Sequence, residues 1–227
     1  MVVIPAKNEE ATIGLVVKKI KADLGSEIVV VNDGSTDNTV DEAISAGAKV
    51  LSPVLPLGAW GATQTGIHYA LKKGCAAVVT MDADGQHESA FVSEMHALIA
   101  SGQADVVIGS CPQRGSVSRR LAWAMFRKLT GLGFGDLTSG FRIYNRAAME
   151  VLASAEATLL DYQDIGVLIM LRKAGLEIKE YPVAMSQRQT GKSRIFNSWF
   201  AVSWYLLQTG ILCLARWESK VPTAPRP

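Results

Sequence analysis

The residues best suited to chemistry follow a short apolar run, Ala76–Thr80, which leads into Asp82, Asp84 and Gln86 at alternate positions. An apolar run of this length between polar residues is typical of a strand buried on both faces. In an extended chain, residues two apart point to the same side, so these oxygens could face one hard cation. Mg²⁺ or Mn²⁺ held in this way keeps positions for waters and substrate phosphates. The alternative is a solvated Asx-rich turn, which Asp-x-Asp-Gly by itself favours.

The elements that must position these residues alternate apolar β-branched runs with amphipathic stretches. We expect strands over Val2–Ile4, Ile28–Val31, Lys49–Leu51, Ala76–Thr80 and Asp105–Ile108. We expect helices over Ala11–Leu24, Thr36–Ala46, Ala62–Lys73 and Ser89–Ser101, with a Pro- and Gly-rich loop over Ser52–Trp60. Strands that alternate with helices imply a mainly parallel, doubly wound sheet with right-handed crossovers.

Polar loops follow three of these strands, over Pro5–Glu9, Asn32–Asp37 and Asp82–Gln86. In a parallel sheet such loops converge on one edge, where open α/β sheets bind their ligands. Turn formation explains Asp-Gly-Ser-Thr well, and explains Asn8-Glu9 and the aspartate pair less well. Neither a Gly-x-Gly-x-x-Gly fingerprint after a strand nor a Walker-A sequence occurs, which disfavours a dinucleotide oxidoreductase and a P-loop ATPase.

Composition narrows the class of protein further. At 227 residues the chain is one large domain, or one domain with an appendage. Its 23 basic and 21 acidic residues nearly cancel, which argues against a general nucleic-acid binder. Three widely spaced cysteines fit a reducing compartment without a disulfide framework, and the three histidines have no metal-ligand spacing. The N-terminus has no signal-peptide pattern, so we do not expect export.

Six segments occur in the order found in family 2 glycosyltransferases of the GT-A fold. They read VVIPAKNEEATI, EIVVVNDGSTDNT, PLGAWGATQTG, VTMDADGQHE, DLTSGFRIYNR and YQDIGV. The resemblance extends from Val2 to about Arg194 and is strongest to the branch that glycosylates polyprenol and dolichol phosphates. It implies a Rossmann-like three-layer αβα sandwich that transfers a sugar, with inversion, from a nucleoside-diphosphate sugar to a polyprenyl phosphate at the cytoplasmic membrane face.

The resemblance also assigns residues to the donor side of the site. Those implied to bind the nucleotide are Pro5, Ala6, Asn8, Glu9, Asp33, Gly58, Gly61 and Asp82. Carboxylates and amides suit base edges and sugar hydroxyls, and glycines allow close backbone approach. Asp82, Asp84 and Gln86 match the Asp-x-Asp metal motif, which implies Mg²⁺ or Mn²⁺. The family's usual Asp-Asp-Gly is Asn32-Asp33-Gly34 here, and the second aspartate is retained.

The acceptor side of the site is implied to be basic. The residues that match the family's acceptor segments are Arg114, Arg119, Arg127, Arg188, Lys192 and Ser193. Arginine forks suit phosphate oxygens, and lysine acts as a point charge. The alternative for any one arginine is a solvated surface side chain. The Gln-x-x-Arg-Trp sequence of processive polysaccharide synthases does not occur.

Asp164 aligns with the family's candidate catalytic base, although Gln163 replaces the usual acid before it. A hydroxyl acceptor needs a carboxylate to remove its proton, whereas a lipid phosphate is already anionic. Asp164 could also be an N-terminal carboxylate of the helix that ends at Lys173. Two other functions therefore stay open: a transferase with a hydroxyl acceptor, in a glycan or lipid headgroup, and a non-catalytic nucleotide-sugar-binding subunit. The latter would be expected to have a damaged Asp-x-Asp motif.

The C-terminal segment suggests where the protein acts. No charged residue lies between Arg194 and Arg216, and aromatic side chains cluster at one end of this stretch. We expect residues 1–194 to form the transferase domain and residues 218–227 to be disordered. Residues 195–217 are expected to form a helix that lies on the membrane surface or pairs in a homodimer, with a buried core helix as the alternative. This implies a cytoplasmic protein attached peripherally to the inner face of the cell membrane.

Overall fold

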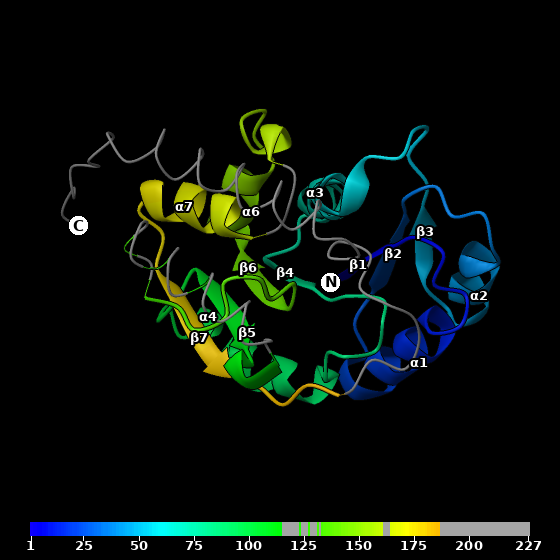
Figure 1. Cartoon of the computed structure of the whole chain (residues 1–227), viewed down its shortest axis with the longest axis horizontal. Helices are drawn as coiled ribbons and strands as arrows, with labels where there is room; N and C mark the ends of the chain where they lie inside the picture. Colours follow the sequence, from blue (N-terminus) through cyan, green and yellow to red (C-terminus); the bar gives the residue numbers. More distant parts are fainter. Residues whose placement is uncertain (115–122, 124–126, 128–130, 132, 161–163, 187–227) are drawn as a thin grey trace.

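The computed structural model of the chain describes residues 1–114, 123, 127, 131, 133–160 and 164–186. Its centre is a seven-stranded sheet in the order β3-β2-β1-β4-β6-β5-β7 (Figure 1). The strands are β1 (Val2–Ala6), β2 (Ile28–Asn32), β3 (Lys49–Leu51), β4 (Ala77–Thr80), β5 (Val106–Ser110), β6 (Arg142–Asn145) and β7 (Ile178–Pro182). The strand β6 runs antiparallel to its neighbours β4 and β5, and the other pairs are parallel. The predicted mainly parallel sheet is therefore confirmed.

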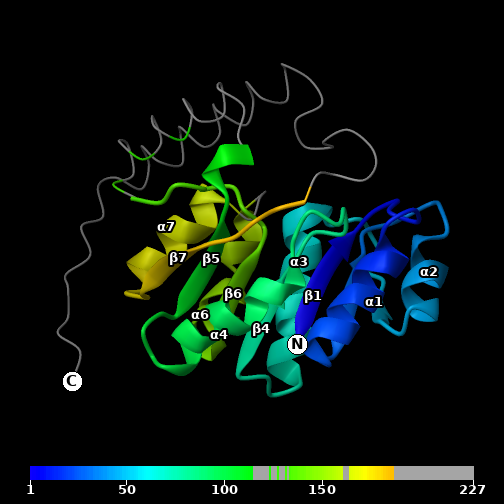
Figure 2. The ribbon, with the colours of Figure 1, turned by 90° about the horizontal axis from the view of Figure 1, so that it is seen from below.

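Helices cover both faces of this sheet. One face packs against α1 (Ile13–Leu24), α2 (Thr39–Ser45) and α4 (Val92–Ala100). The other packs against α3 (Gly58–Lys72), α6 (Arg146–Leu152) and α7 (Ile165–Lys173). Short 3-10 turns are η1 (Ser89–Phe91), η2 (Pro112–Arg114) and η3 (Ala157–Leu159). Alternate residues of β1 enter the two cores, because successive side chains of a strand point to opposite faces. The three-layer αβα sandwich is confirmed (Figures 1 and 2).

Of the element boundaries that differ from the expected ones, those at the end of β1 and the start of α3 do so for a shared reason. The strand β1 continues past Ile4 to Ala6, whose carbonyl accepts a hydrogen bond from the Asp33 N–H at 2.8 Å. The helix α3 begins at Gly58, inside the expected loop, where the Asp33 carboxylate caps its first turn. In both cases residues distant in sequence satisfy backbone groups that local patterns leave unpaired.

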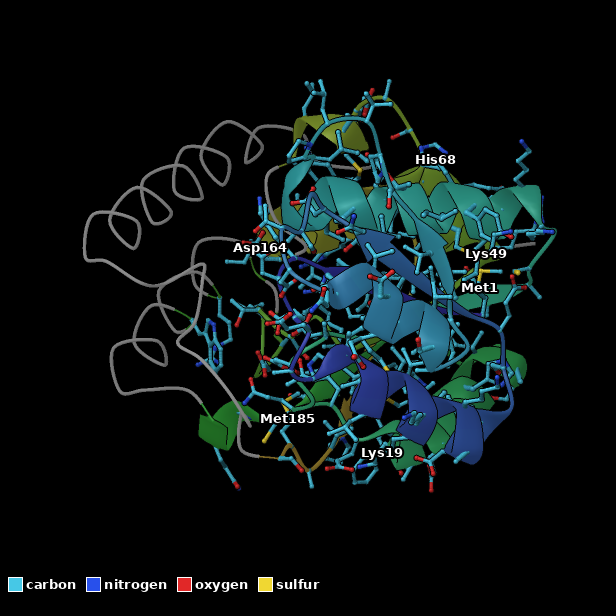
Figure 3. The ribbon with its side chains drawn as sticks, turned by 90° about the vertical axis from the view of Figure 1, so that its right-hand side faces the viewer. Met1, Lys19, Lys49, His68, Asp164 and Met185 are labelled. Atoms are coloured by element: carbon cyan, nitrogen blue, oxygen red, sulfur yellow. The ribbon has the colours of Figure 1, made fainter. Side chains whose placement is uncertain are left out.

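The carboxyl ends of β1, β2 and β4 lie at the same edge of the sheet, because these adjacent strands are parallel. Figure 3 shows Met1 and Lys49, at the starts of β1 and β3, on one side of the molecule. Asp164 and Met185 lie on the opposite side, toward which β1 and β3 run. The predicted convergence of the three polar loops on one edge is therefore confirmed.

Among the described residues, no helix is both long enough and apolar enough to cross a membrane. The expected helix over residues 195–217 and the expected disordered tail over residues 218–227 lie outside the described residues.

Candidate functional site

The loops after β1 and β2 are joined by hydrogen bonds from both main chain and side chains. Asn8 Oδ1 accepts from the Thr36 N–H at 2.7 Å, and the backbone N–H of Asn8 donates to Ser35 Oγ at 2.9 Å. The Glu9 N–H donates to Thr39 Oγ1 at 2.7 Å. Asn8 has a φ of +51°, a left-handed conformation that asparagine adopts more readily than most residues. The predicted nucleotide residues Asn8 and Glu9 thus belong to one braced pair of loops.

Asp33 connects the loop after β2 to the start of α3. Its Oδ1 accepts from the backbone N–H groups of Leu57 at 2.6 Å and Gly58 at 3.1 Å, while Oδ2 lies 4.0 Å from Lys7 Nζ. Gly58 has a φ of +76°, so a side chain there would strain the cap. This arrangement places Asp33, Gly58 and the end of β1 together at the sheet edge. Gly61 follows within the first turn of α3.

The segment after β4 is a turn and not the extended chain from which the facing carboxylates were inferred. Asp84 Oδ1 accepts from the Gln86 N–H at 3.1 Å, and Gly85 has a φ of +75°. Asp84 is buried, whereas the Asp82 side chain is 45% exposed. The Asx turn and the candidate cation site therefore involve the same residues. The turn, and not the alternation of side chains along a strand, determines where these side chains lie.

The Asp82 side chain has two close neighbours that the sequence did not identify as functional. The Asp82 N–H donates to His87 Nδ1 at 3.0 Å, and His87 Nε2 lies 3.5 Å from Asp82 Oδ2. A Cβ atom built on Gly140 would lie 2.6 Å from Asp82 Oδ1. His87 is buried and stacks on Phe141, with ring centroids 5.1 Å apart. In the sequence, only the position of His87 directly after Gln86 indicated that it could lie beside Asp82.

The donor atoms of the turn fit a hard divalent cation. Two carboxylates and an amide side chain supply oxygen ligands, which Mg²⁺ and Mn²⁺ prefer. Within the described part of the chain, no three His, Cys, Asp or Glu side chains come together as a possible metal cluster. One or two carboxylates completed by substrate phosphates and waters form the usual Mg²⁺ site of phosphate-handling enzymes. The oxygens of Asp82, Asp84 and Gln86 are compatible with that type of site.

A short antiparallel contact joins this turn to the chain that follows β7. His87 forms an isolated β-bridge with Met185, and the Ser186 N–H donates to the Gln86 carbonyl at 3.0 Å. The Glu88 carboxylate accepts hydrogen bonds from Lys19 Nζ and Ser186 Oγ. These bonds, that of Lys19 foremost, lower the pKa of Glu88 below its usual 4.5. The turn Asp82–Gln86, called the metal turn below, is thereby held beside Ser186. In the sequence, Ser186 directly precedes the basic segment 187–194.

The predicted acceptor-side residues are described only in part. Arg114 ends the 3-10 turn after β5. Arg127 is half-buried, and its guanidinium donates to the Phe134 carbonyl at 3.4 Å. Arg119, Arg188, Lys192 and Ser193 lie outside the described residues.

Asp164 is the N-cap of α7, and its side chain accepts from the Gly166 N–H at 3.3 Å. The helix-terminal position considered from the sequence is therefore present in the structure. Asp164 also lies on the side of the molecule that holds Met185 (Figure 3), so the cap position is compatible with a place at the site.

The acidic turn lies at the carboxyl edge of the sheet, where open α/β folds bind their ligands, and its oxygens suit a metal-assisted transfer reaction at a phosphate group. The model of the family "Glycosyl transferase family 2" matches residues 1–153, and the chain belongs to this family. It is a glycosyltransferase, as the sequence predicts.

Two named relatives extend over most of the chain. Polyprenol monophosphomannose synthase of Mycolicibacterium smegmatis is 30% identical, covering 87% of this chain and 81% of its own. Undecaprenyl-phosphate mannosyltransferase of Micrococcus luteus is 28% identical, covering 86% of each chain. Both are proteins to which this chain is similar over nearly its whole length.

Among solved structures, the chain resembles glucosyl-3-phosphoglycerate synthase of Mycobacterium tuberculosis. The complex of that enzyme with Mn²⁺, uridine-diphosphate-glucose and phosphoglyceric acid superposes with a TM-score of 0.71 at 25% identity, over 95% of this chain and 78% of that one. A second complex of that enzyme contains Mg²⁺ and uridine diphosphate. The fold expected from the sequence is thus that of a structurally characterised, metal-containing glycosyltransferase.

Proposed function

We propose that this protein is a divalent-metal-dependent, inverting glycosyltransferase that moves a sugar from a nucleoside diphosphate to a polyprenyl phosphate. Residues 1–194 form the transferase domain. The relatives that act on polyprenol and undecaprenyl phosphates support this acceptor class. The single structural observation that carries the proposal is the contact of Gln86 and Glu88 with Ser186, because Ser186 directly precedes the basic residues of 187–194 in the sequence.

The proposed roles of the donor-side residues follow from the charge of the leaving group. Loss of the sugar leaves negative charge on the diphosphate, which a divalent cation bound there neutralises as a Lewis acid. Asp82 and Asp84 would hold that cation, with Gln86 as a third oxygen ligand. Asp33 and the braced loop of Asn8 and Glu9 face the same edge and suit the nucleoside, through carboxylate and amide contacts with base and ribose.

The acceptor side follows from the basic residues. Arg188, Lys192 and Ser193 would bind the lipid phosphate, together with Arg114, Arg119 and Arg127. A phosphate oxygen is already a nucleophile, so its attack on the anomeric carbon requires no strong base. Asp164 would then position the acceptor or a basic residue, consistent with its fixed position as a helix cap.

A hydroxyl acceptor is the second candidate function. It is favoured by the phosphoglyceric acid bound in the structural neighbour, and by 54% identity over 54 residues to glucosyl-3-phosphoglycerate synthase of Mycolicibacterium smegmatis. In that case Asp164 would serve as the general base. The two candidates share the donor site and the metal and differ only in what attacks the sugar.

The proposed location is the cytoplasmic face of the cell membrane, because a polyprenyl phosphate is anchored in the bilayer while nucleotide sugars are water-soluble. The segment 195–217, which contains aromatic side chains and no charged residue before Arg216, suits a peripheral helix at the lipid interface, or helix pairing in a homodimer.

A thermal-shift panel of nucleoside diphosphates, with and without Mn²⁺, tests the donor side. We expect at least one of them to raise the melting temperature more strongly with Mn²⁺ than without it, because a ligand that binds only the folded state stabilises it. Binding without metal dependence would contradict the proposed metal site. A transfer assay that compares a polyprenyl phosphate with hydroxyl acceptors, among them glycans and phosphoglyceric acid, then separates the phosphate acceptor from the hydroxyl acceptor. A folded protein that binds the nucleotide sugar but transfers to no acceptor of either class would be a non-catalytic subunit.

A further inference from the structure

The Asp82 carboxylate is enclosed on two sides by residues outside the metal motif. His87 Nε2 lies 3.5 Å from its Oδ2, and the Cα of Gly140 leaves space for its Oδ1 that a Cβ atom would fill, at 2.6 Å. The Asp82 side chain is nevertheless 45% exposed. His87 and Gly140 therefore restrict its carboxylate on two sides and leave the rest of it accessible to solvent. Such an oxygen pair is limited to few rotamers without being withdrawn from solvent or ligands.

Both ring nitrogens of His87 lie beside Asp82. Nδ1 accepts the hydrogen bond from the Asp82 N–H at 3.0 Å, and Nε2 lies 3.5 Å from Asp82 Oδ2. One imidazole thus contacts both the backbone and the carboxylate of the same aspartate.

The His87 ring itself is fixed by its surroundings. It is 1% exposed, stacks on Phe141 at an interplanar angle of 19°, and its backbone pairs with Met185. A histidine held this tightly cannot turn away from Asp82, which makes it a rigid support and not a mobile side chain.

The backbone at Gly140, on the other side of the Asp82 carboxylate, is also held in place by hydrogen bonds. Thr80 Oγ1 donates to the Gly140 carbonyl at 2.8 Å. The fully buried Arg142 donates from Nε to the Ser139 carbonyl at 2.8 Å and from Nη2 to the Leu137 carbonyl at 3.1 Å. Antiparallel pairing of β4 with β6 places this turn directly against the end of β4. The position of Gly140 relative to Asp82 is therefore set by the sheet.

We propose that His87 and Gly140 are positioning residues that hold the Asp82 carboxylate in the orientation that binds the divalent cation. The inference rests on the proposed metal-dependent function and adds two residues to it. His87 acts on Asp82 through the hydrogen bond that its Nδ1 accepts from the Asp82 N–H and through the 3.5 Å contact of Nε2 with Oδ2, and Gly140 acts by leaving space that any side chain would take. Mutation of residues that contact a metal ligand without binding the metal themselves typically lowers metal affinity 10- to 100-fold.

The decisive variant is His87→Phe. It keeps an aromatic ring to stack on Phe141 and removes both nitrogens that contact Asp82. His96→Phe and His68→Phe are matched controls, because these two histidines are exposed and lie on α4 and α3. Gly140→Ala is a second, independent variant that fills the space beside Asp82 Oδ1.

Mn²⁺ binding is measured directly by electron paramagnetic resonance, alone and with the nucleoside diphosphate that stabilises the wild type. We expect the Kd for Mn²⁺ to rise about tenfold or more in His87→Phe and in Gly140→Ala. The affinity for the nucleoside diphosphate without metal is expected to stay unchanged, as are both properties in the control variants. A purely structural role would lower the melting temperature and leave the Kd for Mn²⁺ of the folded fraction unaltered.

An unchanged Kd for Mn²⁺ in either folded variant, while the wild type binds Mn²⁺, would overturn the positioning role of that residue and leave the proposed function standing. If His87→Phe does not fold, Gly140→Ala decides the proposal. A wild type that binds no Mn²⁺ with the nucleotide would overturn the proposed function itself.

Discussion

Glu88, two residues beyond Gln86, accepts a hydrogen bond from the hydroxyl of Ser186, almost 100 positions further along the chain. The same carboxylate accepts from Lys19 on α1. One side chain therefore joins a helix of the first half, the metal turn and the chain that leads into the basic segment. Its hydrogen bonds to Lys19 and Ser186 are strongest while the Glu88 carboxylate is ionised.

The stability of this junction should depend on pH. The folded-state pKa of Glu88 lies below its usual 4.5, chiefly because of Lys19, so its contribution is complete above 4.5 and is lost as pH falls through the lower folded value. Glu88→Gln should cost less than about 1 kcal/mol at neutral pH, because both partners are partly exposed. Urea unfolding of both proteins from about pH 6 to about pH 3 should show the difference shrinking on acidification. A difference that stays constant with pH would contradict this role for the carboxylate.

Asp33 combines a structural and a binding role, and two substitutions separate them. Asp33→Asn keeps an oxygen that can accept from Leu57 and Gly58, so the fold should stay within about 0.5 kcal/mol of wild type. Asp33→Ala removes the cap and should cost about 1–2 kcal/mol. Both should weaken nucleoside-diphosphate binding if the carboxylate contacts the nucleoside, as calorimetry of each variant would show. Full nucleotide affinity in a folded Asp33→Asn variant would limit Asp33 to the cap.

The sequence predicted the sheet edge where the site forms, because parallel strands joined by helices must bring their following loops together. It did not predict the cap on α3, since Asp33 and Leu57 are 24 residues apart and no periodicity relates them. It also missed Gly140 as a neighbour of Asp82. That contact depends on β6 running antiparallel between β4 and β5, and a strand's direction in the sheet leaves no mark on its own residues.

Asp84 offers a direct test of the cation site. Asp84→Ala should reduce turnover by roughly 10²- to 10³-fold or more, because stabilisation of the leaving diphosphate is lost. Asp84→Asn should lose turnover similarly, yet it retains an oxygen for the Gln86 N–H and should melt near the wild-type temperature. Glu94→Ala, at an exposed position on α4, is the control. Near wild-type turnover in Asp84→Asn would rule out this aspartate as a metal ligand.

Substitutions in the basic segment 187–194 should impair use of the acceptor and leave binding of the donor nucleotide unchanged. Arg188→Ala combined with Lys192→Ala should lower kcat/KM for a polyprenyl phosphate by about 10- to 100-fold, because two charge-assisted contacts to phosphate are removed. The Kd for the nucleoside diphosphate should remain unchanged. Lys72→Ala with Lys73→Ala, a pair of exposed lysines at the end of α3, matches the change in charge. An equal effect of both double variants would indicate a general electrostatic contribution and not a phosphate site.

Asp164 distinguishes the two candidate acceptors most sharply. Asp164→Asn keeps a side-chain oxygen for the Gly166 N–H, so α7 should stay capped and the melting temperature nearly unchanged. It removes the only group at this position that could accept a proton from a hydroxyl. With a phosphate acceptor we expect turnover within about tenfold of wild type, because the attacking oxygen is already ionised. With a hydroxyl acceptor the loss should be about 10²- to 10⁴-fold, the usual contribution of a general base. Turnover with each acceptor, measured at saturating nucleotide sugar and Mn²⁺, decides between them. A severe loss with polyprenyl phosphate would mean that the positioning role of Asp164 requires its negative charge, since no proton has to be removed.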